Sequence, residues 1–134
     1  MNYMDYGVPL GRRFRALKLW FVMRYYGREK LAELMRNQVA WAQELAAAVD
    51  ADPDFERTAP APLSVVCFRY KGSDDQNRRI LEAVNAAGEF FLSHTMLRGK
   101  YSLHLAIGNM GTTRDHVMRV WEAVRRAALR TVSQ

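Results

Sequence analysis

The stretch 101–107 reads Tyr-Ser-Leu-His-Leu-Ala-Ile and alternates large apolar side chains with small or polar ones. Successive side chains of a β-strand point to opposite faces of the sheet. The alternation therefore predicts a strand whose buried face carries Tyr101, Leu103, Leu105 and Ile107. The opposite face carries Ser102, His104 and Ala106. A histidine at that position either bonds locally on the sheet or lines a cleft against a partner domain.

Two more strands are predicted from their composition. The apolar run 90–96 is joined to the first strand by Leu-Arg-Gly-Lys, in which Gly99 supplies the positive φ of a hairpin turn. The run 63–70 is rich in β-branched and aromatic residues and ends before Gly72. Cys67 lies in the middle of this run, and we expect it to be buried in the core and unreactive.

Capping signals place helices beside these strands. Ser73 and Gln76 have the spacing of a capping box, and the helix that they start is expected to end at Gly88. Thr112 or Thr113 is expected to cap a last helix. One face of that helix carries Val117, Val120, Trp121, Val124, Ala128 and Thr131.

The part of the chain before the strands predicts two helices. Residues 9–26 form the first, because Pro9 suits a helix start and Gly27 suits a helix end. After Lys18 this helix has no polar stripe, so we expect it to be covered on every side. Residues 28–50 form the second, whose apolar side chains recur at three-and-four spacing.

The order of these elements is α-α-β-α-β-β-α. This order predicts an α+β fold, in which two N-terminal helices precede a βαββα unit with a small, mainly antiparallel sheet covered by helices. We expect residues 1–27 to form an N-terminal segment and residues 28–134 to form a small α+β domain.

The composition is that of a basic chain of 134 residues, with 20 Lys and Arg, 14 Asp and Glu and a formal net charge of +6. The basic residues are scattered outside 12–28, so we do not expect nucleic-acid binding. No apolar run approaches the length of a membrane span and the N-terminus lacks a signal-peptide pattern. The single cysteine has no intrachain disulfide partner. These features predict a cytoplasmic protein without membrane association.

Few motifs carry chemistry. The run 108–111 lacks the lysine and the spacing of a phosphate-binding loop. The three histidines fall on different predicted elements, which argues against a metal site. Ser93, His104 and Asp115 could be combined as a hydrolytic triad, but chains of this size offer such combinations by chance.

A group of arginines stands at the start of the first predicted helix, at positions 12, 13 and 15. The helix dipole disfavours cations at that end, so an acidic group should compensate them. That group is either a carboxylate elsewhere in the protein, or an anion or substrate carboxylate near Gly11 and Arg12.

The segment 8–21, Val-Pro-Leu-Gly-Arg-Arg-Phe-Arg-Ala-Leu-Lys-Leu-Trp-Phe, resembles the start of the C-terminal region of a known family. That family is the pyridoxal-phosphate-dependent group II amino-acid decarboxylases, which include aromatic-L-amino-acid decarboxylase. The runs 66–70, 91–95 and 103–109 follow in the family's order and at similar spacing. The resemblance covers nearly the whole chain from Asp5 onward.

The resemblance implies the C-terminal small domain of a fold type I enzyme. In that family a lysine preceded by histidine forms a Schiff base with pyridoxal phosphate, and an aspartate pairs with the pyridine nitrogen. Both lie in a large domain that precedes the matched region. None of the four lysines here follows a histidine. We therefore expect a carboxy-lyase domain, of the aromatic-amino-acid type, that is inactive and binds no cofactor when alone.

The resemblance also implies partners and substrate-proximal residues. The partners are the large domain of the same enzyme and a second copy, both contacted through the first helix. Gly11 and Arg12 belong to a turn close to the active site at the family's dimer interface. His104 stands where many members have arginine. No catalytic, cofactor-binding or metal-binding residue is expected in the chain.

A different class of function also fits the residues. The chain can be read as a stand-alone basic α+β module that binds nucleic acid or a protein partner. Retention on DNA that falls steeply with salt would favour that alternative.

Overall fold

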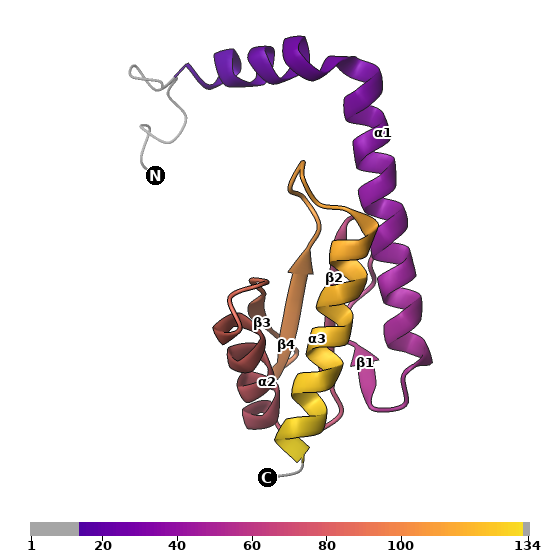
Figure 1. Cartoon of the computed structure of the whole chain (residues 1–134), viewed down its shortest axis with the longest axis vertical. Helices are drawn as coiled ribbons and strands as arrows, with labels where there is room; N and C mark the ends of the chain where they lie inside the picture. Colours follow the sequence, from indigo (N-terminus) through magenta and orange to yellow (C-terminus); the bar gives the residue numbers. More distant parts are fainter. Residues whose placement is uncertain (1–13, 133–134) are drawn as a thin grey trace, which may run out of the picture. The chain divides into compact units, whose positions relative to one another are not determined.

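The computed structural model describes residues 14–132. The elements are α1 (Arg15–Ala51), β1 (Phe55–Arg57), β2 (Val65–Tyr70), α2 (Asp74–Ala86), β3 (Ser93–Leu97), β4 (Lys100–Ala106) and α3 (Arg114–Val132) (Figure 1). The chain divides into a unit that ends at Glu33 and a unit that begins at Leu34. The second unit combines helices with a small antiparallel sheet, so the predicted α+β class is confirmed.

The sheet has the strand order β1-β2-β4-β3, and every neighbouring pair is antiparallel. Val66 lies opposite Leu105 and Phe68 lies opposite Leu103, and all four are at most 8% exposed. Residues opposite each other in an antiparallel pair share a face. The buried face predicted for 101–107 is therefore confirmed, and Figure 1 shows α2 and α3 lying over the sheet.

Aromatic side chains from three elements join the sheet to α3. The ring of Trp121 meets Phe55 at 4.9 Å and Phe68 at 5.7 Å, both edge to face. Such pairs add to the stabilisation that area burial supplies. Leu45 and Val49 of α1 are fully buried in the same core. The C-terminal part of α1 therefore belongs to this domain.

The start of α2 braces the sheet where the β2–β4 pairing stops. Ser73 caps α2 and forms the predicted capping box with Gln76. Asn77, which is fully buried, accepts a bond from the amide of Tyr70 at 2.8 Å and donates to its carbonyl at 3.0 Å. Asp74 accepts a bond from the amide of Tyr101 at 3.1 Å. Side chains of the first turn thus replace the missing backbone partners.

The turn between β3 and β4 is the predicted hairpin connection, and it has two central residues, Arg98 and Gly99. Arg98 has φ 51° and Gly99 has φ 75°. Positive φ at both central residues is the geometry that matches the twist of the flanking strands. The positive φ expected at Gly99 is confirmed, and Arg98 adopts the same region.

The helices differ in detail from the helices predicted from the sequence. Gly27 is non-helical (φ 74°, ψ 164°), so α1 consists of two helices that meet where the break was predicted. The expected start at Pro9 lies outside the described residues. At α3, the hydroxyl of Thr113 accepts from the amide of His116, and the His116 ring accepts from the amide of Thr113, both at 3.3 Å. Thr113 is therefore the cap, and His116 completes it.

The strand β1 was not predicted. It pairs with β2 through Phe55 opposite Tyr70 and Arg57 opposite Phe68. The side chain of Arg57 also pairs with Asp50 at 2.7 Å, which ties β1 to the end of α1. The Asp50 carboxylate raises the pKa of Arg57 through this hydrogen bond, so the guanidinium stays charged.

Replacing Asn77 by alanine is expected to lower the free energy of unfolding by about 3 kcal/mol. The change leaves the amide and carbonyl of Tyr70 without their side-chain partner in a buried place. Urea denaturation followed by circular dichroism measures the loss. The matched control is Asn37→Ala at an exposed position of α1, which should shift the value by less than about 0.5 kcal/mol. Equal midpoints for the two variants would contradict the proposed brace.

Candidate functional site

The sheet face turned away from α2 and α3 carries most of the polar side chains of the strands. We call it the open face and define it by Glu56, Cys67, Arg69, Ser93, Thr95, Ser102 and His104. Cys67, His104 and Ser93 are opposite one another on β2, β4 and β3, so they form one row across the sheet. The prediction that His104 faces away from the core is confirmed by this register.

His104 and Ser93 form a hydrogen-bonded pair. The Ser93 Oγ lies 2.8 Å from the His104 Nδ1, and the His104 ring is half-buried. Asp115, the third residue of the possible triad, lies on α3 and pairs with Arg119 at 3.8 Å. A serine nucleophile needs a base that a third group orients. The structure therefore brings together two of the three residues and does not assemble the triad.

Cys67 does not lie in the core, which corrects the expectation from the sequence. Val66 and Phe68 face the core, so Cys67 between them faces the open side, where it is half-buried. Burial still raises the pKa of the Cys67 thiol above its ordinary value. The thiol therefore stays protonated at neutral pH and is a poor nucleophile.

A charged cluster occupies the other end of the open face. Arg69 has a side chain only 7% exposed, and it pairs with Asp74 at 3.0 Å and Glu56 at 3.8 Å. It also donates to the carbonyl of Gly72 at 2.6 Å. Lys100 of β4 reaches the same Glu56 at 3.4 Å. Because Arg69 is held on several sides, its role is to link β1, β2 and α2.

The remaining predicted site residues lie apart from this row. Gly11 and Arg12 lie outside the described residues. His94 stacks on the ring of Tyr101 at 4.5 Å with the planes 10° apart. Each of the three histidines thus has a separate local contact, and the described residues contain no group of three potential ligands for a metal ion.

Two lysines of the described residues bear on the pyridoxal phosphate that the family resemblance implies. A Schiff-base lysine presents a free amine inside a pocket. Lys71 instead donates to the carbonyl of Pro53 at 2.7 Å, and Lys100 pairs with Glu56. The amines of Lys71 and Lys100 are therefore engaged in local contacts on the surface of the domain.

A match to a known protein family identifies the family of this chain. The family of the pyridoxal-dependent decarboxylase conserved domain matches residues 1–71, more than half of the chain. The chain belongs to this family. The decarboxylase resemblance stated from the motifs is therefore confirmed.

Individual relatives match almost the whole chain. A phenylacetaldehyde synthase of Arabidopsis thaliana is 42% identical over 135 residues, which cover 96% of this chain and 28% of the relative. The aromatic-L-amino-acid decarboxylase of Sus scrofa is 43% identical over 124 residues, 92% of this chain and 26% of the relative. This chain thus spans little more than a quarter of these curated relatives.

Solved structures show the same relation. The crystal structure of Oryza sativa TDC with PLP and tryptamine matches with a TM-score of 0.82 and 35% identity, over 94% of this chain and 29% of that one. Catharanthus roseus tryptophan decarboxylase in complex with L-tryptophan matches with a TM-score of 0.80 and 34% identity. The fold is therefore that of one part of a pyridoxal-dependent decarboxylase. None of the helices in residues 14–132 is long and apolar enough to cross a membrane.

Cys67 is expected to react slowly with a thiol reagent in the native chain. Its raised pKa keeps the thiolate fraction below that of a free cysteine, whose pKa is about 8.5. The labelling rate should therefore rise with pH through a midpoint above that value, and unfolding in urea should return the midpoint to it. Ellman's reagent at a series of pH values gives both curves. Coincident native and unfolded curves would show that the strand does not shield the thiol.

Proposed function

We propose that this chain is the C-terminal small domain of a pyridoxal-phosphate-dependent amino-acid decarboxylase, a carboxy-lyase most similar to the aromatic-amino-acid type. One observation carries the proposal. More than nine-tenths of the chain matches such enzymes at 42–43% identity, yet the chain covers only 25–26% of their length. A domain of this kind acts together with the large domain of such an enzyme.

We assign the decarboxylation chemistry to that large domain. Pyridoxal phosphate, when bound, takes up the electron pair left as carbon dioxide departs. The sequence contains no His-Lys pair, and the contacts of Lys71 and Lys100 hold their amines elsewhere. The chain alone is therefore proposed to bind no cofactor and to have no activity. The large domain supplies the lysine and the phosphate site.

The first helix is proposed as the contact with that large domain or with a second subunit, and residues 1–27 form this segment. Leu19, Trp20, Phe21 and Met23 are each more than half exposed, and so is Tyr25. Consecutive helical residues point about 100° apart, so no single partner surface covers all of them. Residues 28–134 then form the small domain proper.

The substrate side is proposed to include Gly11, Arg12 and His104. His104 supports this placement because its ring stands on the open face, where Ser93 holds its Nδ1. An imidazole is shorter than the arginine of many relatives and does not form the same bidentate pair with a carboxylate. We therefore expect a substrate preference that differs from those relatives. We also propose a cytoplasmic location, because the single cysteine of this chain has no intrachain disulfide partner.

A graft tests the proposed function. Residues 1–134 replace the matching segment of the Sus scrofa aromatic-L-amino-acid decarboxylase, and release of carbon dioxide from aromatic L-amino acids is measured. The graft is expected to be active, whereas the same enzyme truncated before the segment and this chain alone are inactive. Titration of the chain alone should leave the absorption of pyridoxal phosphate unchanged.

Two results would contradict this assignment. One is a folded graft without activity. The other is a stoichiometric change in cofactor absorption by the isolated chain that disappears when one of its four lysines is replaced.

The isolated chain is expected to self-associate through its first helix. Each large apolar side chain left in water forgoes roughly 1.5–3 kcal/mol relative to burial, so the exposed set favours pairing. Sedimentation velocity at several concentrations should show association for the wild type and its loss in Trp20→Glu and Phe21→Glu. The matched control is Phe91→Glu, at an aromatic residue 83% exposed in the second unit, which should associate like the wild type. A wild type that stays monomeric at high micromolar concentration would refute the pairing.

A further inference from the structure

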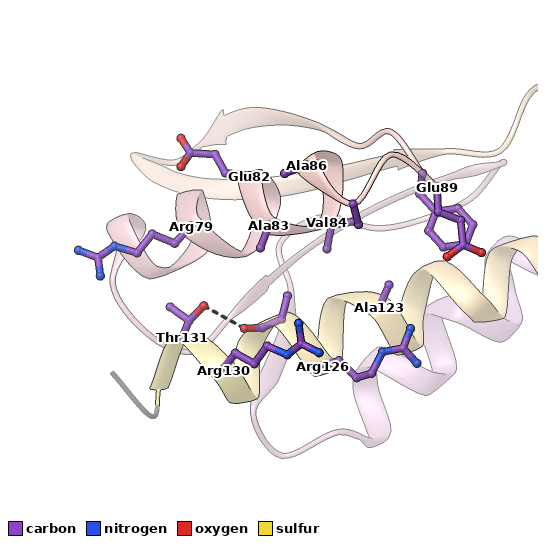
Figure 2. A pocket seen from close by; sticks show the side chains of 13 residues that line it. Arg79, Glu82, Ala83, Val84, Ala86, Glu89, Ala123, Arg126, Arg130 and Thr131 are labelled. Atoms are coloured by element: carbon purple, nitrogen blue, oxygen red, sulfur yellow. Dashed lines mark hydrogen bonds between the residues drawn. The ribbon is translucent and has the colours of Figure 1, made fainter.

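A groove of about 680 Å³ runs between α2 and α3 (Figure 2). Both helices face it with short side chains. These are Ala83, Ala86, Ala87, Ala123 and Ala127. Larger residues at such positions interdigitate and close the space between packed helices. The alanines leave an apolar trough on the surface of the domain.

Arginines stand along the groove. Arg79 comes from α2, while Arg126 and Arg130 come from successive turns of α3 and lie along that helix in Figure 2. Asp75 is shared by Arg78 at 3.6 Å and Arg79 at 2.9 Å, so one carboxylate serves two cations. On the α2 side the groove is therefore lined by Arg79 together with Glu82.

The α3 side is compensated even less. Arg126 reaches Glu122 only at 3.9 Å, and within residues 14–132 no carboxylate pairs with Arg130. Two glutamates also line the groove. Glu89 is taken up by Arg119, and Figure 2 shows Glu82 pointing away from α3.

We propose that this groove binds an acidic amphipathic helix of a partner protein. The apolar face of that helix would lie on the alanines, with its carboxylates toward Arg126 and Arg130 on one side and Arg79 on the other. The walls are two helices whose backbone groups are bonded internally, so they offer no edge to which a strand could add. Small residues allow a third helix to approach closely.

The charges argue against other occupants. Residues 14–33 of this chain carry five basic and two acidic side chains, so the chain's own first helix is repelled by the arginines. A single-stranded nucleic acid stacks its bases on open aromatic faces. The one aromatic residue in the groove, Phe90, has the guanidinium of Arg119 over its ring at 5.7 Å. An acidic amphipathic helix therefore matches both the alanines and the arginines of the groove.

The test uses the full chain and a synthetic fluorescent peptide of about five helical turns, with leucines at three-and-four spacing and glutamates on both flanks. Binding is measured by fluorescence anisotropy, beside a peptide in which lysine replaces every glutamate. The double variant Arg126→Glu, Arg130→Glu reverses the charge on the α3 side of the groove. Ala83→Trp places a large ring in the groove from an exposed position.

Both groove variants are expected to weaken binding of the acidic peptide at least about tenfold, and the lysine peptide should not bind. The matched controls are Arg36→Glu with Arg98→Glu for the charge change, and Ala47→Trp for the added ring. All three control positions are exposed and lie outside the groove, so they should change the affinity less than about twofold. Thermal unfolding verifies that each variant is folded.

Three outcomes would overturn the proposal. The first is no binding of the acidic peptide at high micromolar concentration. The second is equal binding of both peptides. The third is binding that survives both groove variants but is lost in Trp20→Glu, which would place the peptide on the first helix.

Discussion

The alternation of side chains along β2 and β4 is the constraint on which the rest of the domain depends. It sends Phe68 and Leu103 into one core with Trp121 and sends Cys67 and His104 to the other face. A shift of the register by one residue would exchange the two faces. The brace at Asn77 stands where this pairing stops, so it helps to hold the register.

Local signals in the sequence predicted the elements that depend on local chemistry. The Ser73–Gln76 box and the turn at Gly99 need only a few neighbouring residues, and both are confirmed. The strand β1 was missed because three residues are too few to show a period. Cys67 was assigned to the core because residues 65–68 are all apolar. Such a run has no polar residue to show which side chains face the core and which face away from it.

The candidate site was predictable only in part, for a different reason. The alternation of 101–107 places His104 on the open face, but its contact with Ser93 depends on how β3 and β4 align. The same holds for Arg69, whose partners come from β1 and α2. Contacts between distant segments carry no local signature. Only the family resemblance linked these residues to a decarboxylase, and the two remaining substrate-proximal candidates lie outside the described residues.

The two ends of the sheet are protected to different degrees. A strand at the edge presents free backbone groups to which another chain can add. β1 has three residues, which is too short to template a long addition, and Pro53 precedes it closely. β3 has five residues and, within the described part of the chain, pairs only on its β4 side. β3 therefore offers more backbone for the addition of another strand than β1 does.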